Sequence, residues 1–417
     1  MLTRHLYRSF SQRCSIVAGS LGNGPTMEAM SQSRQRSVKH PVYLDHAATT
    51  PMLAEAIDAL IPWLRDEFGN PSGVHSVSRR ARQGLEEARD SFAETIGAKA
   101  REIVFTGGGT EAINLALTGV LNNPSNVIAW SGIEHDAVRS LMEASAKAGR
   151  CESLELTVDA DGVLDLVAAR LSLVAAGQKV RAVCVMAVNN EVGTVQPIGE
   201  LRALMNKIVP RAVLIVDAVQ ALAWMDVAPI VAAADLVAFS AHKFGGPKGV
   251  GALMVREGTP ITPLIHGGGQ ERERRSGTQN VAGIVSMALA AKLCAKRRDL
   301  VRIALLRDRL VDGLLTIAGC TETSPRWVKV AGNAHVCIEG VVSEELLVVL
   351  DQLGICASAG SACASGALHL SPVLMAMGVP VSRSAGALRL TLGAASTDSD
   401  IDAALVAIPQ AVAKLRS

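Results

Sequence analysis

The sequence predicts an α/β protein, with a large domain built on a mostly parallel sheet and a smaller α/β domain toward the C-terminus. Two observations predict this class. From residue 41 onward, short apolar runs alternate with helical patterns. After Val281 the pattern changes to a long helical stretch, Val281–Leu315, that is followed by shorter elements. The chain of 417 residues is 49% hydrophobic, which provides enough apolar side chains for a large core.

The expected strands of the large domain are short apolar runs. They are Ile103–Thr106, Asn126–Trp130, Leu154–Thr157, Ala182–Val188, Val213–Asp217, Leu236–Ser240 and Gly251–Val255. Helical patterns lie between most of them, at Glu111–Val120, Ala137–Ala148 and Ile198–Lys207. Because parallel strands need crossover connections, usually helices, this alternation predicts a sheet that is covered on both faces.

We expect three parts along the chain. Residues 1–40 form an extension, residues 41–290 form the large domain, and residues 291–417 form the small domain. The first residues of the large part could also pack with the small domain. The small domain is expected to contain a strand at Val336–Ile338 and a Leu-rich helix at Glu344–Leu353.

Residues 1–40 are rich in Ser and contain six Lys and Arg residues against one acidic residue. They lack the apolar core of roughly 7–15 residues that a secretory signal needs. This composition is also found in mitochondrial transit peptides, but a disordered extension, or a true start at Met27 or Met30, explains it as well. We therefore expect a cytoplasmic protein, with the mitochondrial matrix as the alternative if residues 1–40 are a transit peptide.

Charge and cysteine content exclude several classes of protein. The net charge of +2 gives no indication of direct nucleic-acid binding. No run reaches the ~18 apolar residues of a membrane span. The eight cysteines form no C-x-x-C pair and no zinc-like spacing with histidine, so we expect no metal site. Without an export signal, free thiols are expected.

The most informative segment is Ser240–Gly249, a Gly-rich loop after an apolar strand, with Lys243 near its start. A lysine in such a loop is usually a solvated surface residue. The alternative is a lysine that forms a Schiff base with pyridoxal phosphate (PLP), with its neighbours orienting it and holding the phosphate.

A carboxylate at the end of another strand favours the second interpretation. Asp217 ends the apolar run Val213–Asp217, where it could also cap a following helix. PLP enzymes place a carboxylate against the protonated pyridine nitrogen. Because Lys243 follows Asp217 by 26 positions, one helix and one strand fit between them. Both side chains are then expected at the carboxyl edge of the sheet, where α/β proteins bind ligands.

Two further segments are expected at the same carboxyl edge of the sheet. The turn Gly107–Gly109 joins an expected strand to an expected helix, and free N–H groups at such a helix start can bind an anion. The simpler interpretation is a tight turn in which Thr110 caps the helix. His135 follows the next strand, where it could stack on a planar ring or lie in a loop without a function.

Taken together, the motifs of the chain resemble the PLP-dependent cysteine desulfurases of the long-loop type. The matching segments are Tyr43–Thr50, Asn70–Ser72, Gly109–Glu111, Glu134–His135, Asn189–Gly193, Asp217–Gln220, Ser240–Lys243, Gly267–Glu271, Arg275–Thr278 and Gly360–Cys363. Their joint order and spacing make the resemblance specific, and it extends from about Tyr43 to Leu392. It implies PLP fold type I, which aminotransferases share, with PLP bound by the large domain.

The resemblance implies roles around the cofactor ring. Lys243 would form the Schiff base and later act as the acid and base at the substrate carbon. Asp217 would pair with the pyridine nitrogen, and Gln220 would hydrogen-bond to the phenolic oxygen. His135 would stack on the ring as a further catalytic residue.

It also implies roles at the phosphate and the substrate. The phosphate would be held by Gly109, Thr110, Ser240 and His242, with Thr278 reaching it from the other subunit of a homodimer. Asn190, beside the cofactor, and Arg389 would bind the substrate carboxylate. An Arg fork suits that planar anion.

Cys363 lies in a segment, Ala357–Ala367, that contains only Ala, Ser, Gly and Cys. Such a segment has few side chains to anchor it in a core, so we expect it to be mobile. By itself this could be a neutral linker. With the resemblance, Cys363 becomes the nucleophile that forms a persulfide, whereas Cys356, after an apolar run, is expected to be structural.

The implied reaction converts L-cysteine to L-alanine and passes sulfur to an acceptor protein, such as an iron–sulfur scaffold or a relay for tRNA or cofactor thiolation. The segment Leu368–Pro372 departs from the acidic residue and proline that the family often has there, which leaves the acceptor open. Alternatives are a selenocysteine lyase, another PLP-dependent lyase or aminotransferase, and a non-catalytic scaffold.

Overall fold

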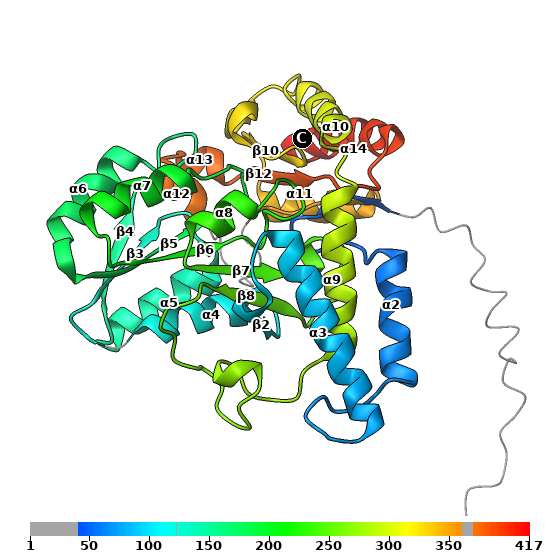
Figure 1. Ribbon diagram of the computed structural model, residues 1–417. Coiled ribbons are helices and arrows are strands. Elements are labelled where there is room, and N and C mark those ends of the chain that lie inside the picture. Colours follow the sequence, from blue (N-terminus) through cyan, green and yellow to red (C-terminus); the bar gives the residue numbers. More distant parts are fainter. Residues whose placement is uncertain (1–40, 122, 361–369) are drawn as a thin grey trace, which may run out of the picture. The chain divides into compact units, whose positions relative to one another are not determined.

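The computed structural model describes residues 41–121, 123–360 and 370–417, of which Val42–Ser417 form one compact unit (Figure 1). Residues 1–40 and Cys363 lie outside the described residues, so the expectations about them stay predictions. Among the described residues, no helix combines the length and the apolar character needed to cross a bilayer.

A seven-stranded sheet forms the centre of the molecule, in the order β2-β8-β7-β6-β5-β3-β4. The strands are β2 (Ile103–Thr106), β3 (Val127–Ser131), β4 (Glu152–Leu156), β5 (Val180–Met186), β6 (Val213–Asp217), β7 (Leu236–Ser240) and β8 (Gly251–Val255). Neighbours from β4 to β7 pair in parallel, and β8 runs antiparallel to β7 and β2. The predicted mostly parallel sheet is confirmed.

Helices cover both faces of this sheet (Figure 1). One face carries α4 (Gly109–Val120) and α5 (Asp136–Lys147), and the other carries α6 (Leu166–Ala176), α7 (Ile198–Ile208) and α8 (Ala228–Ala233). Successive residues of a strand point to opposite faces, so both sets must be apolar. In β6, Leu214 and Val216 join the core under α6–α8, whereas Val213 and Ile215 join the core under α4 and α5.

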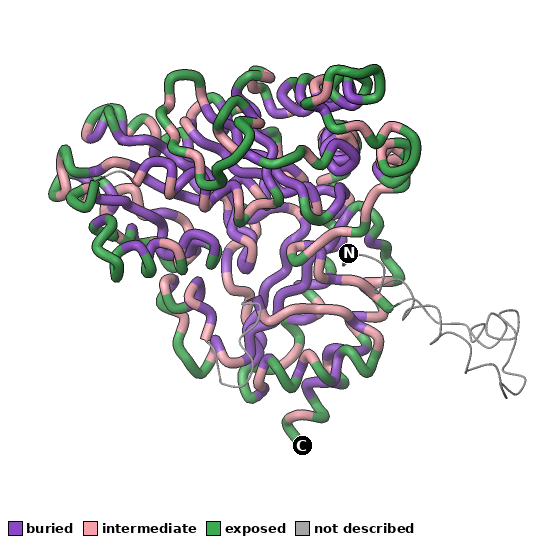
Figure 2. The backbone as a smooth tube through the Cα atoms, turned by 90° about the horizontal axis from the view of Figure 1, so that it is seen from below, coloured by how far each residue is buried: buried purple, intermediate pink, exposed green. Residues whose placement is uncertain are grey.

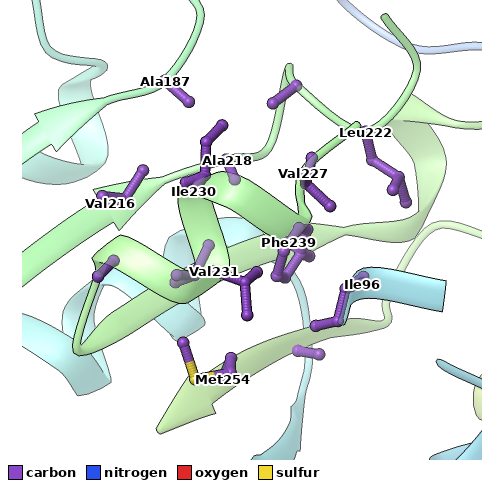
Figure 3. Close-up of a cluster of buried hydrophobic side chains, with 14 of the residues drawn as sticks. Ile96, Ala187, Val216, Ala218, Leu222, Val227, Ile230, Val231, Phe239 and Met254 are labelled. Carbon is purple, nitrogen blue, oxygen red and sulfur yellow. The ribbon is translucent and has the colours of Figure 1, made fainter. Parts of the chain in front are cut away.

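Figure 3 shows part of the core between α8 and the sheet, where Ile230 and Val231 of the helix lie beside Val216 and Phe239 of the strands. Phe239 also meets Phe92 edge to face, with ring centroids 5.6 Å apart. In Figure 2 the buried residues gather in the interior and the exposed residues lie mostly at the surface. This core fixes the strands whose ends carry the candidate site.

Three long helices pack together at one end of the sheet: α2 (Ala54–Arg65), α3 (Ser76–Ile96) and α9 (Val281–Lys296). The single helical stretch expected from Val281 to Leu315 is instead two helices, because Asp299 accepts the N–H of Arg302 and starts α10 (Leu300–Leu314). The boundary expected near residue 290 falls inside α9, whose Ala290 and Ala291 belong to the large core. The division into two domains therefore stays a prediction.

A second, antiparallel sheet has the order β12-β10-β9. It consists of β9 (Cys320–Glu322), β10 (Asn333–Ile338) and β12 (Ala387–Thr391) and shares an apolar core with α10, α11 (Ser343–Gln352) and α14 (Asp398–Arg416). The short helices α12 (Pro372–Ala376) and α13 (Val381–Ser384) precede β12. Near the start of the chain, β1 (Val42–Tyr43) pairs in parallel with β11 (Ile355–Cys356), so the residues after it pass from this part of the molecule to the larger sheet.

Candidate active site

The candidate site lies at the carboxyl edge of the large sheet. Asp217 is the last residue of β6 and Ser240 is the last residue of β7, which leads directly into a 3₁₀ turn, Ala241–Lys243. The register pairs Asp217 with Ala238, so the two strands end close together. This is the edge at which ligands bind in parallel α/β sheets.

A cavity of about 200 Å³ opens at this edge. Its lining residues are Gly109, Thr110, His135, Ala137, Met186, Val188, Asn190, Asp217, Val219, Gln220, Ser240, His242 and Lys243. Nine of the residues predicted from the sequence therefore line one cavity, although they come from five separate segments of the chain.

The amine of Lys243 lies within the site and donates to the backbone carbonyl oxygens of Ala47, at 2.6 Å, and Ala48, at 2.8 Å. Burial lowers the pKa of Lys243 to about 8, and the positive charge of Arg389 acts in the same direction. A lowered pKa leaves more of the amine neutral, which is the form that attacks a carbonyl carbon. Gln220 donates to the same Ala47 carbonyl at 2.8 Å.

Asp217 is buried, with 6% of its surface exposed. Its Oδ1 accepts the N–H of Val219 at 2.9 Å, and among the described residues it forms no ion pair. Burial raises the pKa of Asp217, because the charged form is less well solvated there. A buried carboxylate without a cation is costly, so this site fits a ligand that brings a protonated nitrogen.

Glu134 is a second buried carboxyl group, close enough to Asp217 for the two charges to interact, and no role was predicted for it. Its Oε1 accepts the N–H of Met186 at 2.7 Å, whereas Oε2 is buried and has no hydrogen-bond partner in the part of the chain that the structure describes. Burial and the nearby Asp217 raise the pKa of Glu134 well above its ordinary value. Its place in the motif with His135 was visible in the sequence, but its burial was not.

The turn before α4 forms an open cradle. Gly108 occupies the cap position with φ of 151°, so the interpretation of Thr110 as the helix cap is wrong. Thr110 lies in the first turn and is exposed, where the N–H groups of a helix lack intrahelical acceptors. A Cβ on Gly109 would lie 2.8 Å from Val219 Cγ2, which explains the glycine. The cradle fits a phosphate.

Two histidines border the cavity in different ways. His135 Nδ1 accepts the N–H of Ala137 at 3.0 Å and caps α5, so its exposed ring is held at the cavity wall. His242 Nδ1 lies 3.1 Å from Thr49 Oγ1. Burial lowers the pKa of His242 to about 4, with Lys243 acting in the same direction, so this ring is neutral at physiological pH.

Arg389 lies on β12, outside the residues that line the cavity, but it contacts the backbone of Asn190, which lines it. Its Nη1 donates to the carbonyl oxygens of Asn190, at 2.9 Å, and Gly360, at 3.3 Å. Its Nη2 donates to Asp45 Oδ1 at 2.8 Å, and its Nε is buried and has no partner among the described residues. The guanidinium of Arg389 is therefore already paired with Asp45.

Thr278 is exposed and does not line the cavity. The loop that carries it is anchored by Glu271, whose carboxylate accepts two N–H groups of the buried Arg89, at 2.8 and 2.9 Å, and the N–H of Phe105 at 2.9 Å. Burial by itself would raise the pKa of Glu271, but the hydrogen bonds and charge of Arg89 outweigh it and lower that pKa. Thr278 is therefore exposed on a loop that Glu271 anchors to Arg89 and Phe105.

The pKa of Lys243 leads to a test on cofactor-free protein. Labelling with an amine-reactive reagent should reach half its maximal rate at Lys243 near pH 8, because only the neutral amine reacts. Peptide mass spectrometry across a pH series measures this, with the exposed Lys248 as an internal reference. A profile at Lys243 centred on the ordinary value of 10.5 would contradict the geometry described here.

Comparisons with known proteins agree with this arrangement. The aminotransferase class-V family matches residues 42–404. The chain is 39% identical to the cysteine desulfurase IscS of Dictyoglomus turgidum over 91% of its own length and 96% of that relative. It is 40% identical to an IscS-like cysteine desulfurase of Mycobacterium tuberculosis, over 90% of its length and 97% of that relative.

Solved structures extend the similarity to the fold. A NifS-like protein superposes with a TM-score of 0.83 at 33% identity, over 90% of this chain and 100% of that one. A NifS-like protein from Rickettsia africae gives a TM-score of 0.81 at 28% identity, over 89% and 99%. The chain belongs to the aminotransferase class-V family and, within it, to the cysteine desulfurases.

Proposed function

We propose that the protein is a cysteine desulfurase that uses PLP, converts L-cysteine to L-alanine and collects the sulfur as a persulfide on Cys363. The observation that carries this proposal is the meeting of the Lys243 amine and the Asp217 carboxylate in one cavity, next to a cradle for an anion. The relatives named cysteine desulfurase support the choice of substrate.

PLP, when bound, supplies an aldehyde that condenses with amines and a ring that stores the electron pair of a substrate carbon. Asp217 would face the ring nitrogen and gain the cation that its buried carboxylate lacks. Gly109, Thr110, Ser240 and His242 would surround the phosphate, and Gln220 would donate to the phenolic oxygen. His135, at the N-terminus of α5, would lie against the ring.

The chain's own groups would then handle protons and the substrate. Lys243, with a pKa of about 8, can accept the proton of the substrate Cα and return it later. Asn190 and Arg389 would hold the substrate carboxylate, with Asp45 giving up part of its contact with Arg389. Since Asp45 keeps Arg389 oriented before substrate arrives, little reorganisation is needed.

Cys363 would attack the sulfur of the substrate as a thiolate. A sulfur–sulfur bond forms as the carbon–sulfur bond breaks. The electron pair of the broken bond stays with the carbon skeleton, which takes up a proton on its way to alanine, and both sulfur atoms are oxidised to the persulfide level. A free thiol has a pKa of about 8.5, so only a few per cent is thiolate at neutral pH unless it is assisted.

The persulfide would pass to an acceptor protein, an iron–sulfur scaffold or a thiolation relay. We also propose that the reaction takes place in the cytoplasm, since residues 1–40 lack the apolar core of an export signal. Cell fractionation tests this, and recovery of the protein in mitochondria would favour the transit-peptide interpretation.

We further propose a homodimer in which Thr278 completes the phosphate site of the other subunit. The support is its exposed position on an anchored loop, away from the cavity of its own chain. Mixing Thr278→Ala chains with Lys243→Ala chains should restore part of the lost activity, because one site of each mixed dimer is intact. If the mixture stays as inactive as the Lys243→Ala protein, Thr278 does not act across subunits.

The function itself is tested at Cys363. Cys363→Ser should leave PLP binding unchanged but reduce alanine and persulfide formation by several orders of magnitude, on the scale of the ~10⁶-fold seen when a nucleophile is removed. Cys356→Ser is the matched control, because Cys356 lies on β11 and burial raises the pKa of its thiol. Alanine formation at the parental rate in Cys363→Ser would favour a lyase or an aminotransferase instead.

A further inference from the structure

Glu134 is a buried acid next to the candidate site, and no cation is paired with it. Only 3% of its surface is exposed. Its Oε1 accepts the N–H of Met186 at 2.7 Å, and Oε2 is enclosed and accepts no hydrogen bond from the residues that the structure describes. Over the same residues, no basic side chain forms an ion pair with it. An ionised carboxylate in such a place would be costly.

Glu271 shows how this protein accommodates a buried glutamate that is ionised. It is 5% exposed, and its carboxylate accepts two N–H groups of Arg89, at 2.8 and 2.9 Å. The hydrogen bonds and charge of Arg89 outweigh burial and lower the pKa of Glu271. Glu134 is buried to nearly the same extent but lacks such a cation, so a bound proton is the remaining way to remove its charge.

Three titratable groups act on Glu134 from the neighbouring elements: Asp217 of β6, Cys184 of β5 and Arg139 of α5. The thiol of Cys184 is itself buried, which raises its pKa well above the ordinary value, so it brings no charge. The guanidinium of Arg139 lies over the ring of Trp130, 5.2 Å from its centroid. Burial and the charge of Asp217 outweigh Arg139 and raise the pKa of Glu134 well above its ordinary value.

The hydrogen bond of Glu134 joins two parts of the cavity wall. Glu134 directly precedes His135, whereas Met186 is the last residue of β5 and pairs in register with Asp217 of β6. His135, Met186 and Asp217 line the cavity, and Glu134 is not among its lining residues. Glu134 therefore acts on the site through its neighbours, because it ties the turn that carries His135 to the strand beside Asp217.

We propose that Glu134 is a positioning residue that holds a proton: as a neutral acid it fixes the turn of His135 to the end of β5 and leaves the negative charge of the pair on Asp217. The inference rests on the proposed function, in which His135 stacks on the ring of PLP and Asp217 faces its nitrogen. A second ionised carboxylate would make Asp217 itself bind a proton more tightly, and a protonated Asp217 could not balance the charge of the ring.

Infrared spectra of the full chain without PLP test the proton. At neutral pH, the difference between the parent and Glu134→Gln should contain the carbonyl stretch of a protonated carboxylic acid. The difference between the parent and Glu271→Gln is the matched control. It should contain only the stretches of a carboxylate, because Arg89 keeps that buried glutamate ionised.

The positioning role is tested on the chain loaded with PLP. Glu134→Ala removes the acceptor of the Met186 N–H and lets the turn of His135 shift. PLP should then dissociate up to about 10-fold faster, the scale of a lost aromatic contact, and the circular dichroism of bound PLP should weaken. Glu134→Gln keeps a neutral acceptor oxygen and should restore the parental values of both. In a His135→Ala background, Glu134→Ala should change neither any further, because the ring that it positions is gone.

The possible results lead to different conclusions. If the parent binds no PLP, the proposed function fails, while the infrared spectra still show whether Glu134 holds a proton. The proposal itself is overturned if the Glu134→Gln difference lacks the acid band, or if Glu134→Ala retains PLP as the parent does. It is also overturned if Glu134→Ala speeds PLP release equally with and without His135. Should Glu134→Ala fail to fold, Glu134→Gln decides, because faster PLP release there would mean that the site needs a charge on Glu134.

Discussion

A buried carboxylate, that of Asp217, and a half-buried amine, that of Lys243, face the same cavity, and their positions depend on how the strands of the large sheet pair. Asp217 and Lys243 are separated in sequence by a turn, α8 and β7, yet the parallel register of β6 and β7 brings them to one edge. Burial raises the pKa of Asp217 and lowers that of Lys243 to about 8. Both groups are thereby less stable in their charged forms, which prepares them for a ligand that supplies a cation and a carbonyl group.

The segment Asp45–Thr50 connects the two sheets at this site. Ala47 and Ala48 accept from Lys243, and Thr50 accepts from Gly245 and donates to His242. On the other side, Asp45 pairs with Arg389, and His46 donates to the carbonyl of Thr391. A shift of the second sheet would therefore move the carbonyl groups that bind the Lys243 amine, because the segment is hydrogen-bonded on both sides.

Much of this arrangement could be predicted from the sequence, since strands buried on both faces are nearly continuous in apolar residues. The runs ending at Asp217 and Ser240 agree with β6 and β7. The break between α9 and α10 was missed, because a helical pattern continues through the cap at Asp299. Glu134 and Asp45 were not assigned roles, because their importance depends on burial and on contacts between distant segments. Arg389 was expected in the site, but it reaches the cavity wall only through a contact of this kind, with the backbone carbonyl of Asn190.

The proposed role of Lys243 and Asp217 is to hold PLP together at the carboxyl edge of the large sheet. Incubation of the full chain with PLP, followed by borohydride reduction and peptide mapping, tests it most directly. A pyridoxyl group is expected on Lys243, together with weaker retention of unreduced PLP when Asp217 is changed to Asn. A pyridoxyl group on the exposed Lys248 in place of Lys243, or unchanged retention in Asp217→Asn, would contradict it.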